Sequence, residues 1–198
     1  MNSNNLIEEI MAAARGCWGI VSGNRRMADE IDGSWSGVST SFIAILMALG
    51  AQAMLELPLP ADVAAPMPLF VLFHLLAVNL AGFYGVYLFL RTKGRPFDFG
   101  SYVSAHNWSN FFFLVLALLL AFVLPGLIGS LVISVITALF YIRAASFLLD
   151  IRGPDVVLMI GAQLLTMFVC VVALMLIGGL VPGVGFHILG EAISNPPG

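Results

Sequence analysis

The residues most capable of chemistry in this sequence are a few polar side chains within long apolar runs. The polar stretch 104–110 places His106 and Asn107 side by side at the start of one such run. A histidine can exchange protons near neutral pH, or it can serve as a hydrogen-bonded residue at a helix boundary. Three further polar residues lie within other apolar runs. The candidate polar site therefore consists of Asn79, His106, Asn107, Arg143 and Gln163.

Arg143 allows two interpretations. It lies near the end of its apolar run, about two helical turns before Asp150. Its guanidinium can extend to the polar interface, or it can pair with a carboxylate such as Asp98 or Asp150. We expect structural pairing, because no acidic residue lies deep enough in another run to complete a proton relay.

The sequence lacks the residue sets of common enzymes. It has no Ser/His/Asp set, no His-Glu-x-x-His helix and no pair of buried carboxylates at a common depth. His74, His106 and His187 are expected at different depths, which disfavours a haem held by two histidines. Cys17 and Cys170 are placed for neither a disulfide nor a metal site. We therefore predict a noncatalytic protein with no cofactor.

The composition indicates the environment in which this chain folds. Hydrophobic residues make up 60% of the sequence and charged residues 10%, whereas soluble domains carry about 25% charge. The apolar residues form runs of about 20 residues or more, the length needed to cross a bilayer core. With a net charge of −3 and 8 basic residues, the chain offers no basic face for nucleic acid. We predict an integral membrane protein that contacts the lipid bilayer and no nucleic acid.

Five apolar runs predict the membrane spans. They cover about residues 38–57, 67–90, 107–124, 126–149 and 156–181. Prolines fall between these runs or at their ends, where a missing N–H does least harm to a helix. Only Leu124, Pro125 and Gly126 join the third and fourth runs, which predicts a tight antiparallel hairpin. Small residues where helices can approach closely include Gly82, Gly85 and Gly161.

An amphipathic helix is predicted before the first span. Apolar residues in this segment, Trp18 among them, recur at three- and four-residue steps and form one stripe. We interpret residues 4–22 as a helix lying flat in the headgroup region. Docking of this helix against a partner subunit is the alternative. The predicted fold class is all-α, a polytopic transmembrane bundle of five spans with an N-terminal interfacial helix.

The basic residues predict the orientation. They precede the first span, fill the second loop or flank the fourth loop: Arg15, Arg25, Arg26, Arg91, Lys93, Arg95, Arg143 and Arg152. Because cytoplasmic loops retain Lys and Arg, we expect residues 1–35 on the cytoplasmic side, residues 36–182 as the membrane domain and residues 183–198 outside. In a bacterial inner membrane, the C-terminal tail is then periplasmic.

Several of these residues are also candidates for binding. Basic side chains near a charged leaflet attract anionic lipid or an acidic partner, although their role in orienting the chain explains them equally well. The stretch from Ser22 to Arg26 can likewise be a polar turn or a partner-binding patch. The candidate lipid or partner contacts are Trp18, Arg25, Arg26, Arg91, Lys93 and Arg95.

Four short strings suggest a family. They are Ser22-Gly23-Asn24, Asp32-x-Ser34, Ser41-Phe42 and Ala105-His106-Asn107-Trp108. Together with five closely spaced spans and short loops, they make the chain resemble the Yip (Ypt-interacting) membrane proteins, and most of all their uncharacterised relatives in alphaproteobacteria. The resemblance implies a five-helix fold and a scaffolding or trafficking-like role, and it supplies no catalytic residues.

These features predict an accessory, assembly or scaffold subunit of a larger membrane complex, bound to other membrane subunits or to copies of itself. One alternative is a small transporter or channel that acts as a homo-oligomer, with the candidate polar site lining its path. Another alternative is lipid sensing by residues 4–22.

Overall fold

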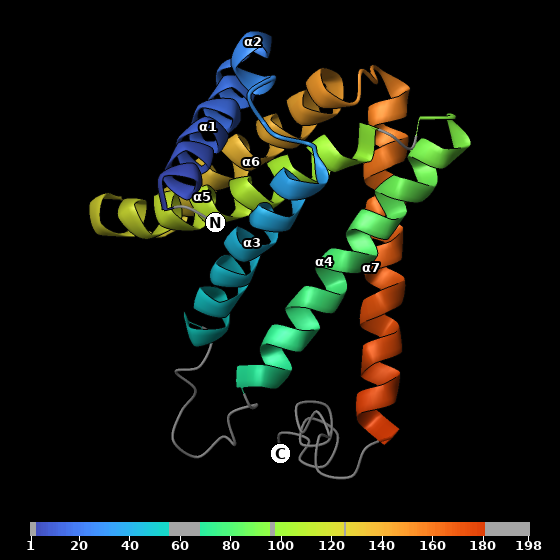
Figure 1. Ribbon diagram of the computed structural model, residues 1–198. Coiled ribbons are helices and arrows are strands. Elements are labelled where there is room, and N and C mark those ends of the chain that lie inside the picture. The colour runs from blue at the N-terminus through green and yellow to red at the C-terminus, as the bar shows by residue number, and fades with distance from the viewer. Residues whose placement is uncertain (1–2, 56–67, 96–97, 125, 181–198) are drawn as a thin grey trace.

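The computed structural model describes residues 3–55, 68–95, 98–124 and 126–180, and this part of the chain contains seven helices and no strand (Figure 1). The helices are α1 (Ser3–Ser22), α2 (Arg25–Ala28), α3 (Trp35–Leu55), α4 (Pro68–Thr92), α5 (Phe99–Val123), α6 (Gly126–Leu148) and α7 (Pro154–Leu180). The five helices α3 to α7 are long and apolar enough to cross a membrane. The predicted all-α class with five spans and a helix before them is confirmed. The expectations for residues 183–198 lie outside the described residues.

Glycine residues end α1 and α4 through the same local geometry. Gly23 and Gly94 adopt φ values of 85° and 70°, which cost other residues more because of their Cβ atoms. The next N–H reaches back to the helix, from Asn24 to the Gly19 carbonyl at 2.7 Å and from Arg95 to the Leu90 carbonyl at 2.9 Å. Both helix ends are therefore Schellman motifs, and the chain turns sharply at each of them.

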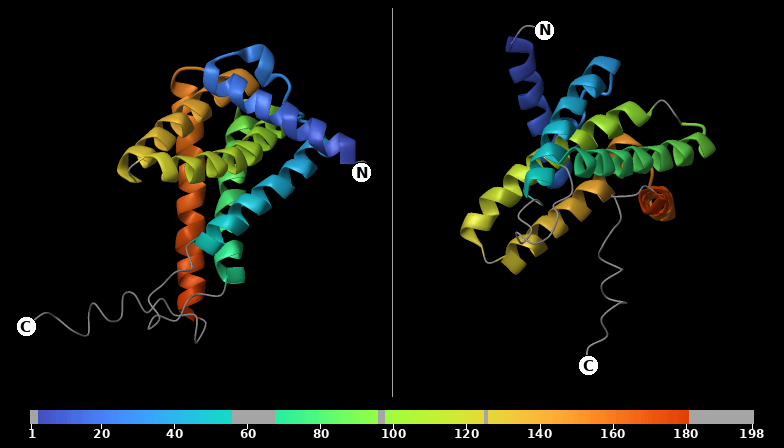
Figure 2. Two further views of the ribbon diagram at one scale, coloured as in Figure 1. Left: turned by 90° about the vertical axis from the view of Figure 1, so that its left-hand side faces the viewer. Right: turned by 90° about the horizontal axis from the view of Figure 1, so that it is seen from below.

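The long helices pack in two main pairs. Helix α4 lies along α7, and α3 packs against α5. Helices α5 and α6 lie side by side as the predicted hairpin, and this hairpin runs steeply across the direction of α7 (Figure 2). The hairpin and the α4–α7 pair meet at one end of the bundle, which is also the end that α1 and α2 cover (Figures 1 and 2).

Small residues bring α4 and α7 together. A Cβ added to Gly85 would meet the Thr166 hydroxyl and the carbonyl of Ala162 on α7. The prediction of close helix approach is confirmed at Gly85. It is wrong for Gly161 within the described chain, where an added Cβ would meet nothing within 4 Å. Hydropathy could not separate these two glycines, because lipid and protein interiors are similarly apolar.

The N-terminal helix packs against its own chain. In α1, Ala13, Cys17 and Ile20 are buried against the bundle, whereas Met11 and Trp18 are 54% and 64% exposed. The apolar stripe predicted along this helix is therefore divided between a docked face and an exposed face. The spacing alone could not reveal this division, since residues on both faces recur at the same steps.

Helix α5 begins earlier than the apolar run suggested. The sequence placed the start of this span near residue 107, but the helix begins at Phe99. The polar residues of stretch 104–110 therefore lie one to three turns inside the helix, and those from 104 to 109 are buried. Neighbouring helices cover them, so they do not need the aqueous boundary that their polarity suggested.

Candidate functional site

The first polar contact inside the bundle joins α4 to α5. Nε2 of His106 lies 3.3 Å from Oδ1 of Asn79. Because a carboxamide oxygen can only accept, Nε2 is the donor in this hydrogen bond. The imidazole packs edge-on against Phe83 and beside Tyr141, with ring centroids 4.8 and 5.3 Å away. His106 is 6% exposed, so it is an interior residue of the bundle and not a boundary residue.

A second contact joins α5 to α7, one turn away. The hydroxyl of Tyr102 donates to Oε1 of Gln163 at 3.2 Å, and the Tyr102 ring lies 6.2 Å from that of His106 between centroids. Sequence reasoning missed Tyr102. The four-residue step from Tyr102 to His106 places both on one helix face, but this signal required a helix that begins before residue 102.

A third contact leaves α5 from another face. Nδ2 of the fully buried Asn107 donates to the Ser41 hydroxyl on α3 at 3.0 Å. Asn107 follows His106 directly, and adjacent helical residues point about 100° apart. Asn107 therefore belongs to the α3–α5 interface and not to the His106 cluster.

Arg143 lies in a third place. Its Nη1 donates to the carbonyl of Val21 in the last turn of α1, where backbone carbonyls lack helical partners and the helix dipole favours a cation. The predicted pairing with Asp98 or Asp150 is wrong for the described residues. Asp98 pairs with Arg95 at 2.7 Å, and Asp150 pairs more loosely with Arg25 and Arg152, at 3.8 Å each. Helix α1, which the sequence analysis placed in the headgroup region and not against its own bundle, supplies the acceptor.

The five predicted site residues therefore separate into three groups. Asn79 and His106 meet directly, and Gln163 joins them through Tyr102, whereas Asn107 and Arg143 each contact another element. Within the described residues, three buried side-chain atoms lack a hydrogen-bond partner, and two of them belong to this group: Nδ1 of His106 and Oδ1 of Asn107. The third is Oε1 of Glu9 in α1. The arrangement connects α5 to three neighbouring helices by hydrogen bonds within the bundle.

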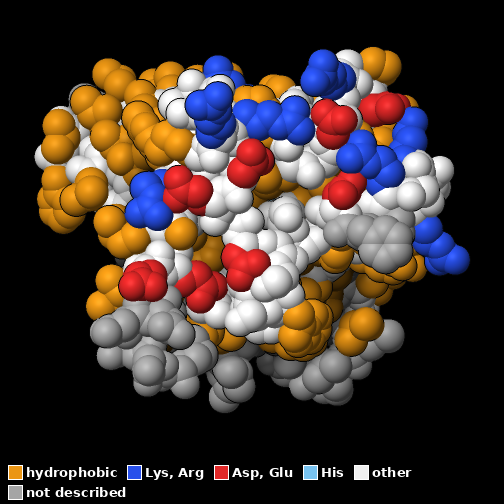
Figure 3. Space-filling view, turned by 45° about the horizontal axis from the view of Figure 1, so that its top comes forward, with side chains coloured by type: hydrophobic (Ala, Val, Ile, Leu, Met, Phe, Trp, Pro, Cys, Tyr) orange, Lys and Arg blue, Asp and Glu red, His pale blue; other side chains and the backbone are white. Residues whose placement is uncertain are grey.

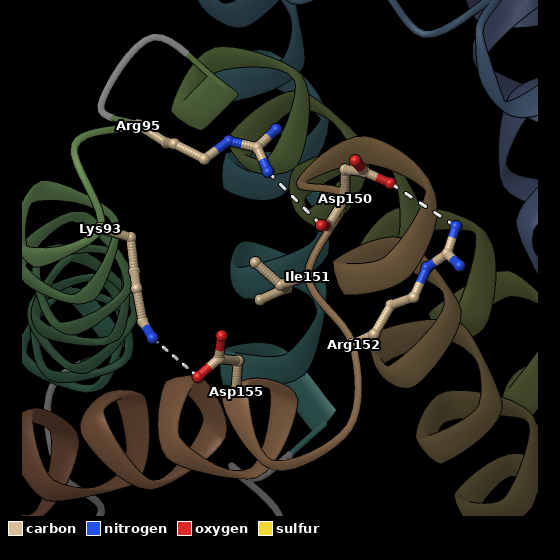
Figure 4. Close-up of a pocket in the computed structure, with 6 residues that line it drawn as sticks. All are labelled: Lys93, Arg95, Asp150, Ile151, Arg152 and Asp155. Carbon is tan, nitrogen blue, oxygen red and sulfur yellow. Dashed lines mark hydrogen bonds and ion pairs between the residues drawn. The ribbon is translucent and has the colours of Figure 1, made fainter.

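A second polar region covers the capped end of the bundle, where Lys, Arg, Asp and Glu side chains gather (Figure 3). It contains a hollow of about 630 Å³ between the end of α4 and the α6–α7 turn (Figure 4). We call this the basic hollow, and its lining residues are Lys93, Arg95, Asp150, Ile151, Arg152 and Asp155. Asp150 has a φ of 47°, a left-handed conformation that Asp tolerates better than most residues.

The structure separates the predicted lipid or partner contacts. Lys93 and Arg95 line the basic hollow, and Arg25 reaches it by pairing with Asp150. Arg26 and Arg91 are exposed and are not among its lining residues. Trp18 lies on the exposed face of α1. Sequence reasoning did not include Arg152, because its position across the hollow from Lys93 depends on the packing of α4 against α7.

Acidic residues gather where α1 meets the α2–α3 connection. Glu9, Glu30 and Asp32 line a small hollow of about 30 Å³, and Arg15 pairs with Glu30 at 2.7 Å. Burial raises the pKa of Glu9, a hydrogen bond to Thr40 lowers it, and the charge of Asp32 raises it further. This hollow is large enough for about one water molecule.

The α1 interface also buries a thiol. Burial raises the pKa of Cys17 to about 12. Because the thiolate is the reactive form, this cysteine is unreactive while α1 stays docked.

Comparison with known proteins gives no relative: no family model, no curated protein and no solved structure matches this chain. The Yip-like resemblance therefore stays a prediction.

Proposed function

We propose that this chain is a noncatalytic membrane protein that serves as an accessory, assembly or scaffold subunit of a larger membrane complex. The observation that supports this proposal is the use of polar side chains within the spans. His106, Tyr102 and Asn107 each form a hydrogen bond from α5 to a different helix. Hydrogen bonds of this kind hold membrane helices together, so these residues are better suited to maintaining a shape than to carrying out a reaction.

Helix α1 supplies the surface that we assign to a partner subunit. One face is fastened to the bundle by buried residues, and the opposite face exposes Ile7, Met11 and Trp18. These three residues follow one another at steps of four and seven, so they form a continuous stripe on the helix. A rigidly docked helix presents such a stripe with little loss of conformational entropy on binding. Contact with lipid is the competing role of the same stripe.

Native purification of the tagged chain distinguishes these roles. We expect a partner in fixed stoichiometry after mild detergent extraction, and we expect Met11→Ser combined with Trp18→Ala to release it. Trp35→Ala is the matched control, since Trp35 is 85% exposed but lies outside the stripe. A monodisperse monomer without partners contradicts the proposal. Retention of the partner by the α1 variant leaves the subunit role intact but removes the stripe as its binding surface.

A small transporter or channel is the second candidate, and the buried, unpartnered atoms Nδ1 of His106 and Oδ1 of Asn107 favour it. Such atoms are costly unless water or a solute binds them. The same purification tests this candidate, because a homo-oligomer without other subunits is its expected outcome. His106→Gln and Asn107→Leu should then abolish transport in reconstituted vesicles while the oligomer persists.

We propose that the capped end faces the cytoplasm of a bacterial inner membrane. Ion pairs and hydrogen bonds link basic segments of α2, the α4–α5 loop and the α6–α7 turn at this end, and cytoplasmic loops retain basic residues. Labelling of intact cells with a membrane-impermeant maleimide tests this orientation. Cysteine placed at Gly126, in the hairpin turn, should be labelled, and cysteine placed at Ser22 should be protected until the cells are opened. The reverse pattern contradicts this orientation.

A further inference from the structure

The basic hollow has the size and the donors of a ligand site. Its volume of about 630 Å³ lies within the range of small-molecule pockets. Lys93 comes from the end of α4 and Arg152 from the α6–α7 turn, so the two lining residues stand on opposite sides of the hollow, with the Arg152 guanidinium turned toward Asp150 (Figure 4). Ile151 is 6% exposed and lies between them. Three cations and two carboxylates line the hollow, which leaves a formal charge of about +1.

The ion pairs within the hollow can be exchanged. The Lys93 ammonium contacts Asp155 at 2.8 Å, but these side chains are 40% and 35% exposed. Arg152 contacts Asp150 at 3.8 Å with its own side chain 78% exposed. Exposed pairs of this kind contribute little to stability, whereas hydrogen bonds from Arg and Lys to a phosphate are short and strong. An incoming phosphate can therefore replace carboxylates as the partner of Lys93 and Arg152.

The position of the hollow indicates how such a phosphate is carried. Lys93 follows directly on α4, which ends at Thr92, and Asp155 lies in the first turn of α7. Leu158 lies one turn beyond Asp155 on the same face of α7 and is 59% exposed, and Leu165 continues that face at 62% exposed. An apolar surface thus leads from the hollow into the span, as a molecule with a phosphate head and an acyl tail requires.

We propose that the basic hollow binds the phosphate group of an anionic phospholipid, with Lys93 and Arg152 as its principal donors and the Leu158 face of α7 along its acyl chain. This inference is independent of the proposed subunit function. It selects two cations out of the eight in the sequence, one of which the sequence did not suggest.

Two substitutions with opposite expected effects on binding affinity test the site. Lys93→Gln removes a donor and should weaken binding of phosphatidylglycerol about tenfold, since the loss of one hydrogen bond to a charged group lowers affinity by about that factor. Asp155→Asn breaks the same ion pair but frees Lys93 and removes a negative charge, so binding should strengthen. If the Lys93–Asp155 pair only supports the local structure, both variants lose affinity for phosphatidylglycerol or neither variant changes it. Either result contradicts the proposed site. Each pair member is part-exposed, so both variants should fold.

Native mass spectrometry of the purified full chain supplies the measurement. Dihexanoyl phosphatidylglycerol is titrated into protein in nonionic detergent, with dihexanoyl phosphatidylcholine and glycerol 3-phosphate as separate arms. We expect one saturable phosphatidylglycerol per chain and weaker binding of the other two compounds. Glycerol 3-phosphate binding as tightly as the lipid overturns the lipid assignment. Equal binding of the choline lipid overturns the anionic selectivity.

Arg26→Gln is the matched control, because it removes the same charge from the same end of the bundle outside the hollow. It should leave phosphatidylglycerol binding unchanged within about twofold. A loss equal to that of Lys93→Gln would show a diffuse surface attraction and overturn the proposed site.

Discussion

The capped end of the bundle and the tip of the α5–α6 hairpin differ sharply in how far their side chains are buried. At the end capped by α1, residues of α4, α5, α6 and α7 form one core with α1, which includes Leu90, Tyr102, Ala144 and Met159. At the far tip of the α5–α6 hairpin, apolar side chains are open, and Phe122 is 89% exposed. Helix α5 runs from the capped end to the tip of the hairpin, so the difference lies within a single element (Figure 2).

The difference follows from what each end must satisfy. Polar groups inside a membrane need partners within the protein, because lipid offers none. Tyr102, His106 and Asn107 therefore lie where several helices and α1 surround them. Exposure to lipid costs apolar side chains such as Phe122 little free energy, so the hairpin tip does not need to be covered by protein. We infer that stability is concentrated at the capped end, and the following predictions test that inference.

The largest contrast is expected within α5. Tyr102→Ala should lower the free energy of unfolding by about 3 kcal/mol, because it leaves a cavity among packed rings. Phe122→Ala should change it by less than about 0.5 kcal/mol, since surface positions rarely matter more. Unfolding by SDS in mixed micelles, followed by circular dichroism, measures both. Similar losses for the two variants would remove the contrast between the ends.

A smaller contrast is expected between two glycines of the α4–α7 pair. Gly85→Leu must push α7 away, since even a Cβ would meet the backbone at Ala162, and overpacking of this kind costs about 1–3 kcal/mol. Gly161→Leu projects into open space and should be close to neutral. The same SDS titration compares them. Destabilisation by Gly161→Leu would indicate that a partner, not lipid, covers the outer face of α7.

The α3–α5 hydrogen bond should contribute less than either packing effect. Double-mutant cycles in a membrane protein give about 0.6 kcal/mol on average for such bonds. We expect a coupling energy of that size between Asn107→Ala and Ser41→Ala, measured from the four unfolding free energies. A coupling near zero would mean that Asn107 is held by packing and that its hydrogen bond is incidental.

The sequence predicted the spans, the hairpin and the clustering of basic loops well, because run length, prolines and charge are properties of single segments. It failed where a side chain's surroundings came from a distant segment. The polarity of stretch 104–110 predicts a helix boundary at Asn107, because the Ser41 hydroxyl that accepts its hydrogen bond lies 66 residues away in the sequence. The sequence likewise predicts a carboxylate partner for Arg143, because its apolar pattern does not show that α1 docks beside this side chain.

The candidate site failed in part for the same reason. Polarity alone groups Asn79, His106 and Gln163. In the structure Asn79 contacts His106 directly, whereas Gln163 joins them only through Tyr102. Apolar periodicity does not separate the buried faces of the helices from the lipid-facing ones, since residues on both are similarly apolar. The position of Arg152 beside the basic hollow likewise depends on the packing of α4 against α7, which the sequence does not reveal.

The smallest predicted effect concerns pH and the docking of α1. Because the pKa of Glu9 is raised on folding, the docked state binds more protons than the released state between the ordinary and the raised pKa. Docking is therefore firmest below the ordinary pKa and weakens as the pH rises through the raised pKa. Asp32 acts in the same direction, and the Thr40 hydrogen bond opposes it. The effect is modest, since Glu9 is only partly buried.

Maleimide labelling of Cys17 reports this docking, because the thiol is buried against the bundle. Glu9→Gln mimics the protonated side chain at every pH, and dividing the wild-type rate by the rate of this variant cancels the titration of the thiol itself. We expect this ratio to stay near one in acid and to rise as Glu9 ionises. A ratio that is constant with pH would mean that the Glu9 carboxylate is solvated in the docked state and that its ionisation does not affect the docking of α1.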